Sequence, residues 1–244
     1  MNIQTGIVGF FDILGYQNLL ENNEPEEIAE TVLPFFAGIK SEVLDDLKKR
    51  NISYKEELII MVRDYIKWLV FSDTILLTMP IQKSDRELNL ILWGIFFMVS
   101  KRLQTMMFRN GLPLRAAISY GKFYIKDTCF AGRTIIEAYL LCNQLEFAAC
   151  VLTESCSKEL ENCDIKKLFN NKDVFDYLVP KKDGESRMLT LAAHTYDREK
   201  EDMTTQVLEA FWGHKKDIPI HVQKKITSTD QWLRFLRLKD TVKD

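Results

Sequence analysis

The sequence predicts an α+β protein built on a ferredoxin-like β-α-β-β-α-β sheet with a C-terminal helical extension. The run 3–14 is continuously apolar, which is typical of a strand buried on both faces. Two further β-like runs, 57–71 and 74–80, are separated only by Ser72 and Asp73, which is the spacing of a hairpin. Long helical patterns follow the first strand and the hairpin, and together these features give the ferredoxin-like order.

Two long helices connect the predicted strands. The segment 24–50 opens with a proline and acidic residues, as a helix N-terminus does, and Pro34 should kink or divide it. The segment 83–111 is rich in apolar residues, and Gly111 is the expected stop. We expect these helices to lie on one side of the sheet.

The rest of the chain adds shorter elements and the extension. The predicted elements are a strand at 112–125, a helix at 131–148, a strand at 150–153, weak strands near 174–180 and 187–193, and amphipathic helices over 197–240. No Pro/Gly/Ser-rich linker or repeat divides the chain. We therefore expect one domain over residues 1–195, with residues 196–244 forming a helical extension packed on it.

Composition limits the classes of partner. The net charge is −2, whereas a nonspecific nucleic-acid binder is usually basic, so no nucleic acid is expected. The longest apolar stretch, 88–100, is about 13 residues, short of the roughly 18–20 that cross a bilayer, and no membrane association is expected. The start of the sequence lacks the pattern of a signal peptide, and five scattered cysteines are most simply reduced thiols. These observations predict a cytoplasmic protein.

Two aspartates stand at positions where a sheet can bring them together. Asp12 ends the first strand, and Asp73 lies at the tip of the hairpin. We expect the first strand to lie beside the first strand of the hairpin, so that both carboxylates meet at one sheet edge. Two neighbouring carboxylates repel unless a cation or proton joins them, and Mg²⁺ or Mn²⁺ prefers such ligands together with substrate phosphates. Gly15 allows the close backbone approach that a phosphate needs, although each aspartate alone also suits an ordinary strand end or turn.

Four motifs in order resemble the class III nucleotidyl cyclase catalytic domain. They are "FFDILGY" (10–16), "FSDTILL" (71–77), "LPLRAAISYGKFY" (112–124) and "FAGRTIIEAYLL" (130–141). The resemblance covers about residues 5–155. It is most similar to the bacterial Pycsar cyclases, which make cyclic pyrimidine nucleotides as antiphage second messengers.

The resemblance implies a mechanism and a set of site residues. Asp12 and Asp73 would bind two Mg²⁺ or Mn²⁺ ions per active site, with the Ile13 carbonyl as a further ligand. The ribose 3′-hydroxyl would attack the α-phosphorus and pyrophosphate would leave. The resemblance also implies a head-to-tail homodimer with sites at the interface. The segment that passes beneath the phosphates would be Ile13, Leu14, Gly15 and Tyr16.

The sequence departs from the family at its transition-state residues. The helix positions that commonly hold Asn and Arg are Ile136 and Leu140 here, and neither can donate a hydrogen bond. Another positive charge is needed to offset charge on the transferring phosphate. Arg115, on a strand pointing to the working edge by the family pattern, is the favoured catalytic candidate, and Arg133 and Lys122 are the others.

The base-reading positions also differ. The usual adenine-reading lysine is Leu69 here, and the partner position before the family glycine is Cys129. On the strand expected over 57–71, Arg63, Tyr65 and Lys67 alternate with a period of two and therefore share one face. An aromatic edge at Tyr65 would favour a pyrimidine by size. Arg63 or Lys67 could donate to a base carbonyl, which favours UTP over CTP because uracil has two carbonyls.

The favoured function is therefore a pyrimidine nucleotide cyclase that converts UTP, or CTP, to its 3′,5′-cyclic monophosphate, with a separate effector protein that senses the product. A catalytically degenerate cyclase fold that binds nucleotide or a protein is the alternative, and another two-metal phosphoryl-transfer enzyme is a third. The run "KKDGESR", 181–187, is predicted as a solvated turn from which a lysine could reach the triphosphate.

Overall fold

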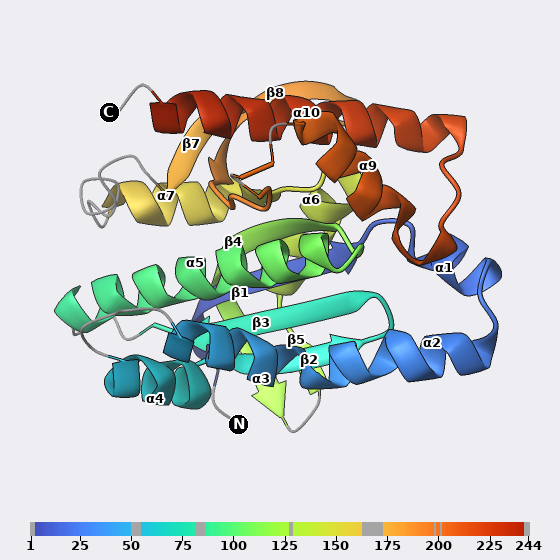
Figure 1. The fold of residues 1–244 in the computed structure, drawn as a ribbon. Coiled ribbons are helices and arrows are strands. Elements are labelled where there is room, and N and C mark those ends of the chain that lie inside the picture. Colours follow the sequence, from blue (N-terminus) through green and yellow to red (C-terminus); the bar gives the residue numbers. More distant parts are fainter. Residues whose placement is uncertain are drawn as a thin grey trace.

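The predicted α+β architecture is confirmed (Figure 1). A computed structural model describes residues 3–49, 55–81, 86–126, 129–162, 173–197, 199–200 and 202–241. The strands of its sheet lie in the order β2-β3-β1-β4-β6-β8-β7, with β5 paired to β4. The strands are β1 Gln4–Ile13, β2 Lys67–Phe71, β3 Thr74–Pro80, β4 Leu114–Lys126, β5 Cys129–Ala131, β6 Cys150–Leu152, β7 Val174–Lys181 and β8 Gly184–Leu191.

Most helices follow the predicted segments, whereas α1 and α7 were not predicted and α4 replaces most of the strand expected over 57–71. The predicted break near Pro34 is present, because α2 ends at Thr31 and α3 begins at Leu33. The expected stop of α5 is also present, since Gly111 has the left-handed φ of 72°. The helices are α1 Tyr16–Glu21, α2 Pro25–Thr31, α3 Leu33–Lys49, α4 Lys55–Tyr65, α5 Arg86–Arg109, α6 Arg133–Gln144, α7 Glu154–Asn162, α9 Met203–Trp212 and α10 Ile220–Thr241, with a 3₁₀ turn η1 Gly213–Lys215.

The prediction of one strand over 57–71 is wrong for most of its length. Residues Lys55–Tyr65 form helix α4, and only Lys67–Phe71 form strand β2. Val62 and Ile66, four residues apart, are both fully buried, which is the spacing of a helical core face. Over so short a window, the apolar residues fit both the two-residue period of a strand and the 3.6-residue period of a helix. Packing of this segment against α3 and α5 favours the helix.

The hairpin is present, but its predicted neighbour is corrected. β2 and β3 are joined by Ser72 and Asp73, and Phe71 pairs with Thr74. β1 pairs with β3, the second strand of the hairpin, and not with β2 as expected. The helical crossover from β1 to β2 leaves room for one strand between them, and β3 occupies that place. Asp12 nevertheless lies opposite Thr74, next to the hairpin tip.

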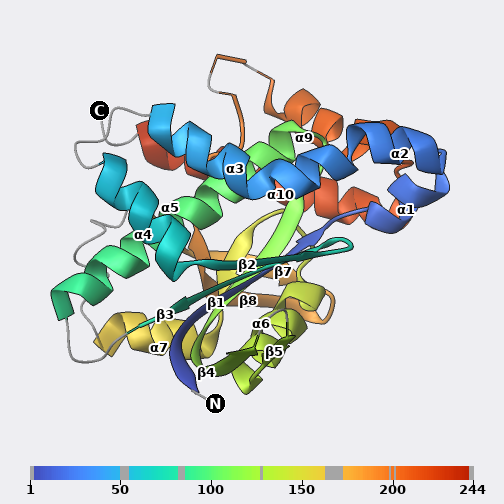
Figure 2. The same cartoon turned by 90° about the horizontal axis from the view of Figure 1, so that it is seen from below.

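Helices cover both faces of the sheet, which corrects the expectation that they lie on one side. Figure 2 shows α3, α4 and α5 on one side of the strands and α6 with β5 on the other. Ile7 and Phe11 of β1 belong to the large core under α5, whereas Val8 belongs to a smaller cluster that Ile135 of α6 joins. Side chains alternate along a strand, so Asp12 lies on the α6 face together with Val8 and Phe10.

The C-terminal helices pack on the far half of the sheet. Figure 1 shows α10 lying over β7 and β8. The ring of Trp232 lies 4.7 Å from that of Tyr177 on β7, and Phe235 contacts Phe175 of the same strand. Leu14, at the end of β1, belongs to this same second core. The predicted division at residue 195 remains a prediction. None of the helices within the described ranges is long and apolar enough to span a membrane.

Candidate functional site

An ion pair between adjacent strands forms the centre of the site. Asp12 of β1 and Arg115 of β4 are register partners, and Arg115 Nε lies 2.6 Å from Asp12 Oδ2. The side chain of Arg115 is only 15% exposed and that of Asp12 only 13%. Asn143, just before the end of α6, holds the guanidinium from the other side, with its carbonyl at 3.3 Å and its Oδ1 at 3.0 Å. Arg115 is therefore fixed in place before any ligand binds.

The second carboxylate lies across the pocket at the hairpin tip. Ser72 has a left-handed φ of 52°, which turns the chain so that Asp73 follows at the start of β3. The Asp73 carbonyl accepts a hydrogen bond from Ile13 N at 3.0 Å, which joins the hairpin tip to the end of β1. Asp73 is partly exposed.

The charge of Asp73 acts on the carboxyl group of Asp12. Burial raises the pKa of Asp12, and the negative charge of Asp73 raises it further, against the opposing effect of Arg115 and, more weakly, of Lys182. Burial and the Asp73 charge also raise the pKa of Tyr16. The end of β1 is thus a place where added positive charge would be favourable.

The segment Ile13–Tyr16 forms the floor of the site. Leu14 N donates to Pro113 O at 2.9 Å, and Gly15, with φ 80°, caps α1 in the left-handed region. That conformation and the exposed backbone of Gly15 suit close approach by a ligand. The sequence placed these residues next to Asp12, and all of them line one cavity with it.

The cavity of about 410 Å³ joins the predicted carboxylates to the C-terminal segment. Asp12, Asp73 and Arg115 line one part of it, and Lys216 and Lys225 line another. The sequence analysis missed these two lysines. No local pattern marks them, because they reach the cavity only through the folding of α9 and α10 onto the sheet.

Lys216 connects the floor of the cavity to two other segments. Its Cδ lies 3.2 Å from the place where a Cβ on Gly15 would lie. Its Nζ donates to the carbonyls of Gly111 at 2.6 Å and Ala210 at 3.4 Å. Gly111 also touches Gly213, on which a Cβ would come within 2.5 Å of Gly111 Cα. Burial lowers the pKa of Lys216 to about 7.

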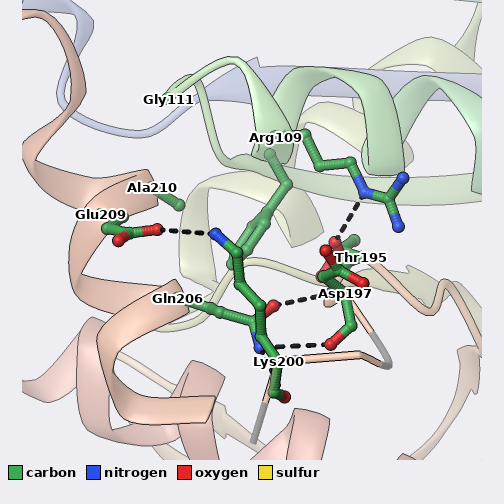
Figure 3. Close-up of a pocket in the computed structure, with 9 residues that line it drawn as sticks. Arg109, Gly111, Thr195, Asp197, Lys200, Gln206, Glu209 and Ala210 are labelled. Carbon is green, nitrogen blue, oxygen red and sulfur yellow. Dashed lines mark hydrogen bonds and ion pairs between the residues drawn. The ribbon is translucent and has the colours of Figure 1, made fainter. Parts of the chain in front are cut away.

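A second cavity, of about 290 Å³, lies next to the residues whose carbonyls bind Lys216 (Figure 3). Gly111 and Ala210, whose carbonyls hold Lys216, both line it. Arg109 spans it toward the Thr195 carbonyl, and Lys200 pairs with Glu209 at 3.6 Å. Lys216 therefore lies between the two cavities.

The four residues predicted to bind the base do not line the cavity that contains Asp12 and Asp73. Arg63 is on α4, exposed, with its Nε 2.9 Å from Asp64, and Tyr65 packs against the large core. They do not share a strand face with Lys67, because α4 is a helix. Lys67 is exposed on β2, and Cys129 is exposed on β5.

The donors fit a divalent cation that shares its coordination with a substrate. The described part of the chain contains no cluster of three or more His, Cys, Asp or Glu side chains. Asp12 and Asp73 are two carboxylates in one cavity, and Mg²⁺ is commonly held by one or two carboxylates plus phosphates. Arg115 engages Oδ2 of Asp12. Asp12 and Asp73 are the residues that would hold the ion.

Comparison with solved structures identifies the fold. No protein-family model matches the sequence, and no curated protein matches it. The chain is similar to the crystal structure of the catalytic core of a rhodopsin-guanylyl cyclase with converted specificity in complex with ATPαS. The TM-score is 0.51 at 9% identity, over 79% of this chain and 97% of that one. The chain therefore has the fold of a class III nucleotidyl cyclase catalytic core, extended at its C-terminus by α9 and α10.

Proposed function

We propose that the chain is a nucleotidyl cyclase that converts a pyrimidine nucleoside triphosphate, UTP or CTP, to its 3′,5′-cyclic monophosphate and pyrophosphate. The observation that carries the proposal is the meeting of Asp12, Asp73 and Arg115 in one cavity on a cyclase-core fold. In the reaction the ribose 3′-oxygen forms a bond to the α-phosphorus and loses its proton, while the bond from that phosphorus to pyrophosphate breaks.

The chain's own residues have separable roles in this proposal. Asp12 and Asp73 would hold two Mg²⁺ or Mn²⁺ ions, with the Ile13 carbonyl as a further ligand. Such ions would polarise phosphate oxygens and favour the ionised hydroxyl. Arg115, fixed by Asn143, offsets negative charge on the phosphates. Gly15 lets the backbone of the floor approach the phosphates.

The proposed base preference rests on β2 and α6. Leu69 offers no hydrogen bond, and Ile136 and Leu140 expose apolar surface where the family commonly has polar groups. Lys67 shares the α6 face of the sheet with Leu69 and Asp12, because positions two apart on a strand point the same way. Its ammonium is our candidate donor to a base carbonyl, which favours UTP. Tyr65 and Arg63 no longer support this role.

A homodimer is part of the proposal. The side chains of Ile136, Tyr139 and Leu140 on α6 are 57%, 48% and 58% exposed, and Phe71 at the hairpin tip is 74% exposed. Phe71 lies on the same sheet face as Leu69 and α6. A second copy covering this apolar surface would complete sites at the interface.

The resemblance to Pycsar cyclases supports a biological role for the product. We propose that the cyclic nucleotide is an antiphage second messenger that a separate effector protein binds. Phage infection of cells carrying the gene should raise the cyclic pyrimidine nucleotide within minutes, and an unchanged level in infected cells would contradict this role.

A binding module without catalysis is the second candidate. The Asp12–Arg115 ion pair favours it, because Arg115 already occupies one oxygen of a proposed metal ligand. One experiment separates the candidates: the purified protein is incubated with ATP, GTP, CTP or UTP and Mg²⁺ or Mn²⁺, and products are identified by mass spectrometry. Cyclic UMP or cyclic CMP is expected. A cyclic purine would overturn the base preference, and binding of nucleotide without any product would favour the binding module.

A further inference from the structure

The end of α6 and the connector that follows it to β6 contact several other parts of the chain near Arg115. Asn143 holds the Arg115 guanidinium, as described above. Gln144 O accepts a hydrogen bond from Lys182 N at 2.9 Å, and Glu146 N donates to Pro180 O at 3.0 Å. The turn between β7 and β8, which carries Lys182, is therefore fixed next to the site.

Helix α10 adds Lys225 to this connector. Lys225 Nζ lies 3.9 Å from Glu146 Oε1, and the two side chains are only 15% and 10% exposed. That separation is an ion pair but exceeds hydrogen-bond length. Within the residues that the structure describes, this ammonium donates no hydrogen bond, so it has donors that a ligand could accept from. Lys225 lines the cavity that contains Asp12 and Asp73.

The charges around Lys225 are dominated by cations. Burial lowers its pKa, Glu146 opposes this, and Arg115, Lys182 and Lys224 lower it further by repulsion. Glu146 partners Lys225 and Asp12 partners Arg115. Lys182 is exposed, and Lys224 Nζ donates to the Lys181 carbonyl at 3.4 Å. Around Lys225 itself the cations therefore outnumber the single carboxylate of Glu146, so a polyanion at its ammonium would offset positive charge. The cavity is also lined by Glu21, Asp73 and Asp217.

We propose that Lys225 of the C-terminal extension is a substrate-binding residue whose ammonium donates hydrogen bonds to the terminal phosphates of the nucleoside triphosphate, beside Arg115. This inference deepens the proposed function and rests on it, because the polyphosphate is that of the same substrate. In this proposal, Lys225 supplies a hydrogen-bond donor that Ile136 and Leu140 cannot supply. The positive charge near the departing pyrophosphate comes from α10, outside the part of the chain in which the sequence resembles cyclases.

The first test is equilibrium binding of inorganic pyrophosphate in EDTA, measured by calorimetry. Lys225→Met should weaken binding roughly 10- to 100-fold, the effect of losing one or two hydrogen bonds to a charged group. Arg234→Met is the matched control, because Arg234 lies on the same helix, exposed and paired with Asp230. It should bind as the parent protein does. Equal pyrophosphate affinity in parent and Lys225→Met would overturn the inference.

A second variant distinguishes ligand binding from a structural role. Glu146→Gln removes the carboxylate that competes for Lys225, so pyrophosphate should bind more tightly. If Lys225 and Glu146 only stabilise the fold, both variants should weaken binding and lower the melting temperature together, and that result would overturn the inference. Lys225→Arg should recover part of the affinity, which also covers the case in which Lys225→Met fails to fold.

Turnover separates this inference from the proposed function. If the parent protein makes a cyclic nucleotide and Lys225→Met raises KM for the nucleotide, both stand. If the parent is active and the variant has unchanged KM and pyrophosphate affinity, the inference is wrong and the function stands. If the parent makes no product but binds pyrophosphate through Lys225, the function is wrong and the anion site stands.

Discussion

Arg115 and Asp12 face each other across β4 and β1, with the guanidinium Nε 2.6 Å from a carboxylate oxygen. Both side chains are largely buried, so each is the main counter-charge of the other. In the resting protein this pair stabilises the end of β1 where a ligand would bind. Activity and stability are therefore linked at this contact.

Arg115→Met should be strongly destabilising, because it leaves Asp12 buried without its cation. Removing one partner of a buried pair costs about 3–5 kcal/mol in the free energy of unfolding. Asp12→Asn combined with Arg115→Met should cost less than Arg115→Met alone, because the stranded charge is also removed. Urea unfolding of the two single variants and the double variant measures this coupling. Simple additivity of the two single effects would show that the ion pair contributes nothing.

Asp73→Asn should abolish cyclic nucleotide formation, with a loss of roughly 100-fold or more, as for removal of a key charge in a catalytic site. The side chain is partly exposed, and the structural hydrogen bond uses its carbonyl, so the fold should be retained. Product formation by mass spectrometry and the melting temperature check the two statements. Asp64→Asn, on the exposed surface of α4, is the matched control and should be fully active. Near-parental turnover by Asp73→Asn would exclude this residue as a metal ligand.

Lys216 should make stability depend on pH. Burial lowers its folded pKa to about 7, below its ordinary value of 10.5. Between these values the unfolded chain binds more protons, so this contribution to stability rises as pH increases from about 7 toward 10.5. Below pH 7 the cost of burying the charge is fully present. Lys216→Met should lack this dependence.

The measurement is the unfolding free energy in urea at pH 6, 7, 8 and 9 for the parent protein and Lys216→Met. The difference between them should change from pH 7 to pH 9, in the direction of greater relative stability for the parent at pH 9. The size of the difference in unfolding free energy at any one pH also includes the lost hydrogen bonds to Gly111 and Ala210. The change of that difference with pH is therefore the quantity that tests the prediction. Parallel curves would contradict the lowered pKa.

Leu140→Glu should break the proposed homodimer, because it places a charge in the exposed apolar surface of α6. Light scattering after size exclusion should give a dimer for the parent protein and a monomer for the variant. Activity should fall with the dimer if the site needs both copies. Leu238→Glu, at an exposed position of α10, is the control and should leave the mass unchanged. A parent protein that is monomeric at all concentrations would refute the dimer.

The sequence was sufficient for the fold class and for part of the lining of one cavity; the roles predicted for those residues remain predictions. The apolar run of β1, the hairpin spacing and the helix between β3 and β4 depend on local patterns, and they led to the right architecture. Asp12, Gly15, Asp73 and Arg115 lie at strand ends or turns that topology alone brings together.

The errors came from features that local patterns do not determine. A short apolar run suits a strand and a helix equally, so the sequence predicts a strand where α4 forms. The predicted placement of Arg63 and Tyr65 on a strand face is wrong for the same reason. The other half of the cavity comes from Lys216 and Lys225, which tertiary packing of α9 and α10 brings to the end of β1. Nothing in the sequence around Lys216 and Lys225 distinguishes these two lysines from ordinary surface lysines.

The contact between Gly111 and Gly213 has a consequence for how this cavity can change. A Cβ on either glycine would lie within 3 Å of the other residue's backbone. Alanine at either position would push the α5–β4 turn and η1 apart, and Lys216 follows η1 by one residue. Its ammonium would then lose Gly111 O, and its stem would leave Gly15. The shape of the cavity therefore depends on the absence of a side chain at Gly111 and Gly213, and one methyl group added at either position would change that shape without a substitution at Asp12 or Asp73.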